Sequence, residues 1–227
     1  MKKSDFIVIL FSIAFFVPFF ISETIYEFYK TFNTEHGFIA AFVKFFILAT
    51  FGESIGLRIR EGIYWRNSFG LPAKAVVWGF LGIVIKAEFI LFGAGSPKVL
   101  EYIGFSLAEL NSQGLNFIKI LSAFSISFFM NIIFSPVLMT FHKITDIHIS
   151  KNGGKFNSLL KKINFTESFN SIDWNIQYNF VFKKTIPLFW IPAHTITFLL
   201  PADFQVLFAA LLGIALGVIL ALAANKK

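Results

Sequence analysis

The chain of 227 residues contains no cysteine. This absence excludes disulfide bonds, thiolate metal sites and cysteine nucleophiles. Charged residues are also scarce, at 15%, and only one long polar stretch occurs, at residues 142–179. We find neither a glycine-rich phosphate loop nor an H-E-x-x-H zinc motif. We therefore expect a protein that is not an enzyme and that holds no cofactor and no metal.

Apolar residues are correspondingly abundant. They make up 56% of the chain, and its mean hydropathy is +0.71, whereas a soluble domain is usually about 45–50% apolar. A membrane span needs roughly 20 apolar residues. Six stretches meet or approach this length: 6–22, 38–57, 72–92, 117–141, 181–200 and 204–224. The sequence predicts an all-α, polytopic transmembrane helical bundle of about six spans, forming a single membrane domain over residues 1–227.

The basic residues predict the orientation of this bundle. With both termini in the cytoplasm, 15 of the 20 Lys and Arg residues fall on the inside and 3 on the outside. Cytoplasmic loops collect Lys and Arg in this way. The net charge of +7 is explained by this bias, so we expect the lipid bilayer as partner and no nucleic acid.

Two segments leave alternatives open. The first span could be a cleaved signal peptide, but Phe19, Phe20 and Ile21 stand where a cleavage site needs small residues, which favours an uncleaved span. In the cytoplasmic loop 142–179, the apolar residues of 156–163 follow helical spacing. This segment is either a short helix on the anionic inner leaflet or a solvated loop.

Ionisable residues inside spans are costly and need a reason. Glu53 lies near the inner end of the second span, and Lys86 and Glu88 lie deep in the third. The two residues of the third span point about 200° apart on a helix, so each needs a partner elsewhere. We expect a Glu53–Lys86 contact, serving either as a packing pair or as the lining of a water-filled path. Lys44 is expected to extend towards the interface.

Polar residues in the fourth and fifth spans can likewise serve either helix packing or the lining of a path. Asn131, which precedes Pro136, either bonds a neighbouring helix or lines a pore. Trp190, His194, Thr197 and Pro201 share one helix face. His194 has no second metal ligand at ligand spacing, so it is either a hydrogen-bonded neutral imidazole or a gating group.

The last span carries small residues at every fourth position, which predicts a face for close helix packing. These residues are Ala209, Gly213, Gly217 and Ala221. The partner helix could lie in the same chain or in a second copy, which would make a homo-oligomer.

Residues 190–205 read W-I-P-A-H-T-I-T-F-L-L-P-A-D-F-Q. They resemble the W-P-x-x-Q-x-x-N-F-x-x-V-P-x-x-Y-R pattern of the family of small peroxisomal and mitochondrial membrane proteins that includes Mpv-seventeen. The residues that carry the resemblance are Trp190, Pro192, His194, Thr197, Phe198, Pro201 and Gln205. His194 and Thr197 stand where the family has Gln and Asn, so the architecture carries over better than any selectivity.

Upstream matches to this family are weaker. They are Gly52-Glu53 with Arg58, Gly79 to Gly82 with Lys86, Asn131 before Pro136, and Trp174. The resemblance implies a weakly selective pore for small solutes. Because the chain lacks an Arg-rich and Ser-rich presequence, we expect a bacterial relative in the inner membrane.

Two functional hypotheses follow. In the first, the chain forms a small gated pore, and its lining or gate includes Glu53, Lys86, Glu88, Asn131, His194 and Thr197. In the second, it is a non-transporting scaffold whose intramembrane charges are packing pairs.

Overall fold

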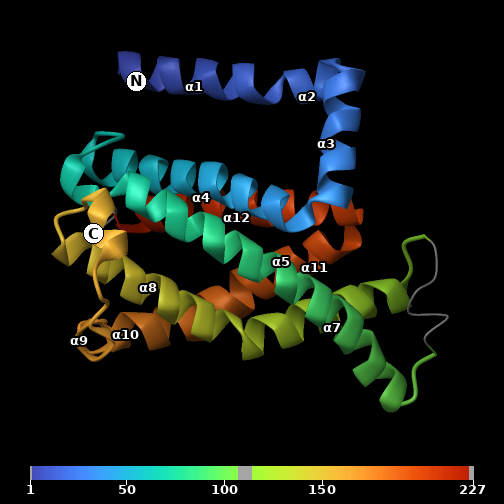
Figure 1. Ribbon diagram of the computed structural model, residues 1–227. Helices are drawn as coiled ribbons and strands as arrows, with labels where there is room; N and C mark the ends of the chain where they lie inside the picture. Colours follow the sequence, from blue (N-terminus) through green and yellow to red (C-terminus); the bar gives the residue numbers. More distant parts are fainter. Residues whose placement is uncertain (1, 107–113, 225–227) are drawn as a thin grey trace.

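The computed structural model describes residues 2–106 and 114–224, and every regular element in this part of the chain is a helix. Figure 1 shows most helices running side by side, with α1 and α2 as a separate layer. The helices are α1 (Lys3–Phe16), α2 (Pro18–Ile21), α3 (Glu23–Glu35), α4 (Gly37–Glu61), η1 (Asn67–Phe69), α5 (Leu71–Tyr102), α7 (Phe117–Ile133), α8 (Ser135–Lys151), η2 (Phe156–Leu160), α9 (Phe165–Asn170), α10 (Trp174–Ile176), η3 (Gln177–Trp190), α11 (Ile191–Leu199) and α12 (Ala202–Ala224).

The bundle has two distinct ends. α1 begins and α12 finishes at the same end, on the left of Figure 1, which we call the terminal end. α3 crosses the opposite end, which we call the distal end, and it connects α2 to the start of α4. η3 and α11 together run from the terminal end to the distal end (Figure 1).

Within the described residues, four helical stretches are long and apolar enough to cross a membrane: Lys3–Ile21, Gly37–Glu61, Asn67–Tyr102 and Ala202–Ile219. α7 and α8, bent by 46° where they meet, qualify as a fifth if they form one broken span. The prediction of an all-α protein with several long apolar helices is confirmed. The predicted span 181–200 is helical but is not in this group; Lys183, Lys184 and His194 reduce its apolar content.

Several boundaries differ from the predicted ones. α5 continues to Tyr102, beyond the predicted limit of residue 92. α8 continues to Lys151, so the first part of the predicted loop 142–179 is helical. Within that loop, residues 156–160 form the 3-10 helix η2, whose Phe156 and Leu160 are exposed. The chain turns tightly at Pro201, because α11 ends at Leu199 and α12 begins at Ala202.

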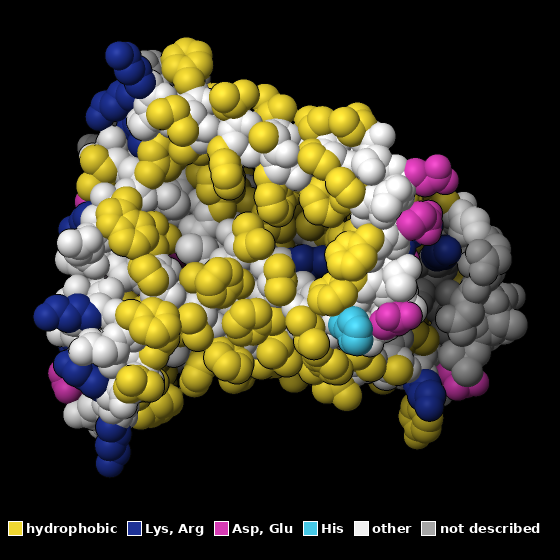
Figure 2. All heavy atoms as spheres, turned by 45° about the horizontal axis from the view of Figure 1, so that its top comes forward, with side chains coloured by type: hydrophobic (Ala, Val, Ile, Leu, Met, Phe, Trp, Pro, Cys, Tyr) yellow, Lys and Arg dark blue, Asp and Glu magenta, His cyan; other side chains and the backbone are white. Residues whose placement is uncertain are grey.

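The surface separates apolar from charged side chains. Figure 2 shows hydrophobic side chains across the middle of one face and Lys and Arg side chains gathered at the left edge. Many of the exposed hydrophobic residues are large, including Phe20, Phe80 and Leu91. An exposed apolar surface of this extent is suited to lipid rather than to water.

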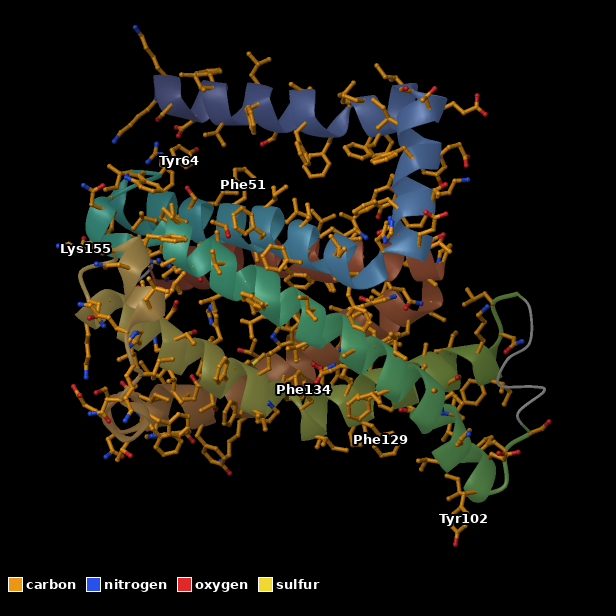
Figure 3. All side chains as sticks on the ribbon, viewed as in Figure 1. Phe51, Tyr64, Tyr102, Phe129, Phe134 and Lys155 are labelled. Atoms are coloured by element: carbon orange, nitrogen blue, oxygen red, sulfur yellow. The ribbon has the colours of Figure 1, made fainter. Side chains whose placement is uncertain are left out.

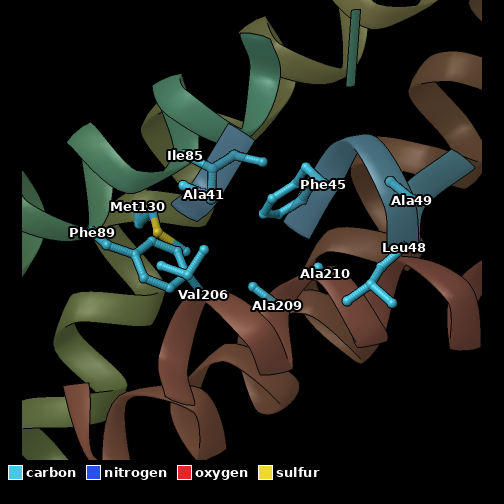
Figure 4. Packing of buried hydrophobic residues seen from close by; sticks show 10 residues of the cluster. All are labelled: Ala41, Phe45, Leu48, Ala49, Ile85, Phe89, Met130, Val206, Ala209 and Ala210. Atoms are coloured by element: carbon cyan, nitrogen blue, oxygen red, sulfur yellow. The ribbon is translucent and has the colours of Figure 1, made fainter. Parts of the chain in front are cut away.

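The core lies where α4, α5, α7 and α12 meet (Figure 4). Its centre combines bulky rings with alanines, which lets the helices approach closely. The buried cluster contains Ala41, Phe45, Leu48, Ala49, Ile85, Phe89, Met130, Val206, Ala209 and Ala210.

Glycines set the spacing of α4 against its two main neighbours. A Cβ atom on Gly82 of α5 would lie 2.6 Å from the carbonyl oxygen of Ala41. A Cβ atom on Gly52 of α4 would lie 3.1 Å from the Cα atom of Ile214 in α12. Larger side chains at these points would push the helices apart.

A polar latch holds the start of α1 against the end of α4. The Asp5 carboxylate accepts hydrogen bonds from Arg58 Nε at 2.7 Å and Nη2 at 2.8 Å, and from the Tyr64 hydroxyl at 3.1 Å. Lys2 Nζ donates to the Gly62 carbonyl at 3.0 Å. Figure 3 shows Tyr64 between the start of α1 and the end of α4. No side chain of α1 is fully buried, and Phe16 at its far end packs partly against the core, so the start of the helix is held by this latch.

Replacing Arg58 with Ala should therefore release the start of α1. Because the native chain has no cysteine, spin labels can be attached at Leu10→Cys and Phe80→Cys, both exposed positions. We expect a broader distance distribution between the labels in Arg58→Ala than in the parent. Arg66→Ala is the matched control, because Arg66 pairs with Glu61 rather than with α1. Equal distributions in all three proteins would contradict the latch.

Candidate functional site

Four ionisable side chains meet near the terminal end of α4, α5 and α8. The Lys74 ammonium of α5 lies 3.1 Å from Glu53 Oε2 of α4 and 3.1 Å from Asp146 Oδ1 of α8. Its side chain is only 6% exposed. His142, one turn before Asp146, completes the group. We call Glu53, Lys74, His142 and Asp146 the ion cluster.

Aromatic side chains enclose the ion cluster. Trp78, one turn after Lys74 on α5, donates from Nε1 to Glu53 Oε1 at 3.4 Å. Its ring centroid lies 4.3 Å from that of His142. The Lys74 ammonium lies 4.1 Å from the ring centroid of Phe69, at a distance suited to a cation–π contact. The aromatic rings limit the access of water to the charges, which strengthens their interactions.

His142 is the least satisfied member of the ion cluster. Its Nε2 atom lies 3.7 Å from Glu53 Oε1 and 3.9 Å from Asp146 Oδ1. Nε2 is buried and makes no hydrogen bond with any described residue. Two carboxylates and one ammonium leave a formal charge of −1, which a proton on His142 would neutralise.

The same residues offer oxygen and nitrogen atoms that could hold a metal. One ligand atom from each of Glu53, His142 and Asp146 lies within 4.8 Å of the others. However, the Lys74 ammonium already lies between the two carboxylates. A divalent cation would have to displace Lys74, so the geometry fits an internal ammonium better than a metal.

The predicted contact between Glu53 and Lys86 is wrong. Lys86 lies at the distal end, where its Nζ atom is 4.0 Å from the position of a Cβ atom on Gly37. Gly37 and Glu53 are separated by roughly 24 Å along α4 at about 1.5 Å of rise per residue. Glu53 pairs instead with Lys74. Lys74 belongs to the part of α5 that lies near the terminal end of the bundle.

Glu88, two residues after Lys86, is buried in α5. It makes no ion pair or hydrogen bond within the part of the chain that the structure describes. Its carboxyl group therefore has no polar compensation from the described residues.

The face formed by Trp190, His194 and Thr197 contacts neither Glu53 nor Lys86. His194 is buried, and its ring meets those of Phe89 at 5.8 Å and Trp190 at 5.2 Å between centroids. His194 Nδ1 and Trp190 Nε1 have no hydrogen-bond partner among the described residues. The Thr197 hydroxyl donates to the Ala193 carbonyl of its own helix at 3.0 Å. This face is therefore packed into an aromatic environment.

Asn131 belongs to a closed hydrogen-bond chain. Its Nδ2 atom donates to the Ser127 carbonyl at 2.8 Å, and its Oδ1 atom accepts from Ser135 Oγ at 2.9 Å. Ser127 Oγ in turn donates to the Ile191 carbonyl at 2.7 Å, which connects α7 to α11. All three side chains are buried, so the chain satisfies polar groups at the α7–α8 bend and joins two helices.

The other residues that carry the family resemblance surround this region. Pro192 lies at the junction where η3 continues into α11. The Phe198 ring packs 4.9 Å from that of Phe89, between centroids. Pro201 separates α11 from α12, and Gln205 Nε2 donates to the Leu200 carbonyl at 3.0 Å. They shape the turn between two helices.

The small residues of α12 face α4 in part. Ala209 is buried in the core, and a Cβ atom on Gly217 would lie 3.6 Å from the Gly52 carbonyl oxygen. A Cβ atom on Gly213 would meet nothing within 4 Å. The side chain of Ala221 lies outside the described residues. Packing within the chain accounts for Ala209 and Gly217 and leaves Gly213 open.

Sequence reasoning missed three of the four cluster residues. Lys74, at the start of the predicted span 72–92, was counted only with the basic residues of the cytoplasmic side, and His142 and Asp146 fall in the polar stretch 142–179. The available signal was the spacing of four between His142 and Asp146, which follows an apolar run without a helix stop. The letters G-x-S-x-G at 52–56 were missed as well. They lie inside α4, where the Ser54 hydroxyl donates to the Tyr64 carbonyl at 2.7 Å, and not at the strand-to-helix turn that a nucleophile requires.

Comparison of the chain with protein-family models, with curated proteins and with solved structures gives no match in any of the three. The functional argument therefore depends on the geometry of this chain.

Proposed function

We propose that the chain is a multi-pass protein of a bacterial inner membrane, with six crossings and both termini in the cytoplasm. The four apolar helical stretches and the bent α7–α8 pair provide five crossings. η3 and α11, which run between the two ends in Figure 1, provide the sixth. The Lys and Arg side chains at the terminal end (Figure 2) support a cytoplasmic position for that end.

We further propose that the protein carries a gated path for small solutes and that the arrangement described above is its closed form. The observation that carries this proposal is the ion cluster. Ionisable side chains within membrane helices are expensive and often mark the paths of ions, protons or polar solutes. His142 adds a fourth ionisable side chain, with its Nε2 atom 3.7 Å from Glu53 Oε1 and 3.9 Å from Asp146 Oδ1.

The closed form is supported by the core between the two polar ends of α4. Lys44 and Glu53 are roughly 13 Å apart along the helix at about 1.5 Å per residue. The buried apolar cluster around Phe45, Leu48 and Phe89 fills the bundle at this level (Figure 4). Opening would require these helices to separate or rotate.

The likeness of residues 190–205 to the Mpv-seventeen family agrees with this proposal. It supplies analogy only, because a shared fold does not establish a function.

The proposal can be tested with purified protein in liposomes. We expect the wild-type protein to raise the swelling rate in glycerol, or proton leak followed with an internal dye, above that of protein-free vesicles. Glu53→Gln should change that rate, because it removes one charge from the ion cluster. Glu101→Gln is the matched control, since Glu101 is exposed near the end of α5. No flux above empty vesicles for any of these solutes would reject the pore.

A scaffold without transport is the second candidate. The observation in its favour is that Lys74 ties together α4, α5 and α8 through two carboxylates. A folded protein with no measurable flux, and with a stability that depends strongly on Lys74, would support the scaffold in place of the pore.

A further inference from the structure

A cavity of about 170 Å³ opens at the distal end, between α3, α4, α5 and α12. Its lining includes Asn33, Thr34, Gly37, Lys44, Lys86 and Asp203. Two of these residues are lysines, from different helices. Figure 2 also shows a basic side chain inside the hydrophobic band, away from both charged ends of the molecule.

The two lysines differ from Lys74 in their lack of acidic partners. Neither Lys44 nor Lys86 forms an ion pair with a carboxylate among the described residues. Among the described residues that line the cavity, Asp203 is the only acidic one. Its single negative charge leaves an excess of one positive charge in a partly buried cavity, where an uncompensated charge is costly.

The position of Lys86 adds to this excess. Its Cε and Nζ atoms reach the start of α4, at 3.4 Å and 4.0 Å from the position of a Cβ atom on Gly37. The first turn of a helix exposes unpaired N–H groups and carries partial positive charge, so a lysine there is unfavourable without an anion. The α4 N-cap residue, His36, provides no side-chain hydrogen bond to this turn. Helix capping therefore does not explain why Lys86 lies here.

Neighbouring groups fix Lys44 and are themselves satisfied. Lys44 Nζ donates to Asn33 Oδ1, and Asn33 Nδ2 donates to the Tyr29 carbonyl at 2.8 Å. The ammonium also lies 4.9 Å from the ring centroid of Tyr29. Burial raises the pKa of Tyr29 to about 12, so its hydroxyl stays protonated and donates to the Asp203 carbonyl at 3.1 Å. The remaining ammonium hydrogens of the two lysines are the donors still free for a ligand.

We propose that this cavity binds a small oxyanion with phosphate chemistry, held between Lys44 and Lys86. The cavity exceeds the roughly 30 Å³ that a water molecule occupies in the liquid, so it admits one phosphate group with a few waters. It is smaller than the ~300–1,000 Å³ of pockets for drug-sized ligands, which favours a single phosphate group over a nucleotide. The phosphate can be free in solution or can belong to an anionic lipid headgroup. This binding does not require that the protein conducts any solute.

Two binding experiments on the full-length protein distinguish these sources. The first adds inorganic phosphate to protein in a neutral detergent and follows heat release. The second compares nanodiscs of phosphatidylcholine with nanodiscs that also contain phosphatidylglycerol, using native mass spectrometry to count retained lipids. Saturable binding of phosphate assigns the site to a free anion, and retention of phosphatidylglycerol alone assigns it to a lipid headgroup. Absence of both overturns the proposal.

Substitution of each cavity lysine tests whether the anion binds in this cavity. Lys44→Gln and Lys86→Gln should each weaken it by roughly tenfold to a hundredfold, the effect of losing one hydrogen bond from a charged group. Lys98→Gln, an exposed lysine of α5, makes the same change in net charge and should leave the affinity unchanged. Equal affinity in all of these variants would place the anion elsewhere and overturn the proposal.

Footprinting tests the same site on the wild-type protein, so its result does not depend on whether the variants fold. The bound anion should slow acetylation of Lys44 and Lys86 by an amine-reactive reagent, measured by mass spectrometry, and should leave Lys98 unprotected. Acetylation of both cavity lysines at the same rate with and without saturating anion would refute the site.

Discussion

Replacing Lys74 with Met is expected to destabilise the protein by ~3–5 kcal/mol, because removing one partner of a buried ion pair leaves its charge uncompensated. Without the Lys74 ammonium, the carboxylates of Glu53 and Asp146 repel each other with no positive charge between them. Both side chains are largely buried, at 17% and 21% exposed. The free energy of unfolding can be measured by titration with a denaturing detergent, followed by circular dichroism.

Two further variants make this result specific. Lys98→Met removes an exposed lysine from the same helix and should change the free energy of unfolding little. The triple variant Glu53→Gln, Lys74→Met, Asp146→Asn removes both carboxylate charges as well and should recover most of the loss. If Lys74→Met unfolds at the same detergent fraction as Lys98→Met, the cluster does not stabilise the bundle.

The second large effect is expected at Gly82, where α5 passes close to the backbone of α4. A Cβ atom there would lie 2.6 Å from the Ala41 carbonyl oxygen and 2.8 Å from Phe45 Cβ. Because the nearest of these atoms belongs to backbone, the helices must move apart. We expect Gly82→Ala to cost about 1–3 kcal/mol, the usual range for an overpacked core.

Gly93→Ala in the same helix is the matched control, since a Cβ atom there would meet nothing within 4 Å. It should stabilise the protein slightly, by up to about 1 kcal/mol, because alanine favours a helix over glycine. The same unfolding measurement checks both variants. Equal effects at the two glycines would show that helix propensity, and not contact between α4 and α5, governs Gly82.

Apolar runs and turn residues predicted the helices well, because these signals are local. The lengths of the apolar runs predicted α4 and α12, and Pro201 indicated the turn between α11 and α12. The ends of α5 and α8 were missed, since polar residues continue a helix without any local stop signal. The ends of these helices, at Tyr102 and Lys151, therefore depend on tertiary contacts, which a hydropathy pattern does not contain.

The site was harder to predict than the fold because pairing depends on the relative position of helices. Glu53 was identified from its cost inside a span, but its partner was not. Lys86 and Lys74 lie on the same helix, 12 positions apart, and only the direction and depth of α5 against α4 decide which of them meets Glu53. Asp146 was hidden for a different reason, because it lies in a helix that was expected to be a loop.

The order of the ion cluster along the chain has a consequence for biosynthesis. Glu53 and Lys74 leave the ribosome before His142 and Asp146 are made. The two earlier residues can already neutralise each other across α4 and α5. Asp146 arrives later with α8 and adds its negative charge to that pair. The contact between α4 and α5 therefore does not need α8, whereas the carboxylate of α8 finds its partner only after Lys74 is in place.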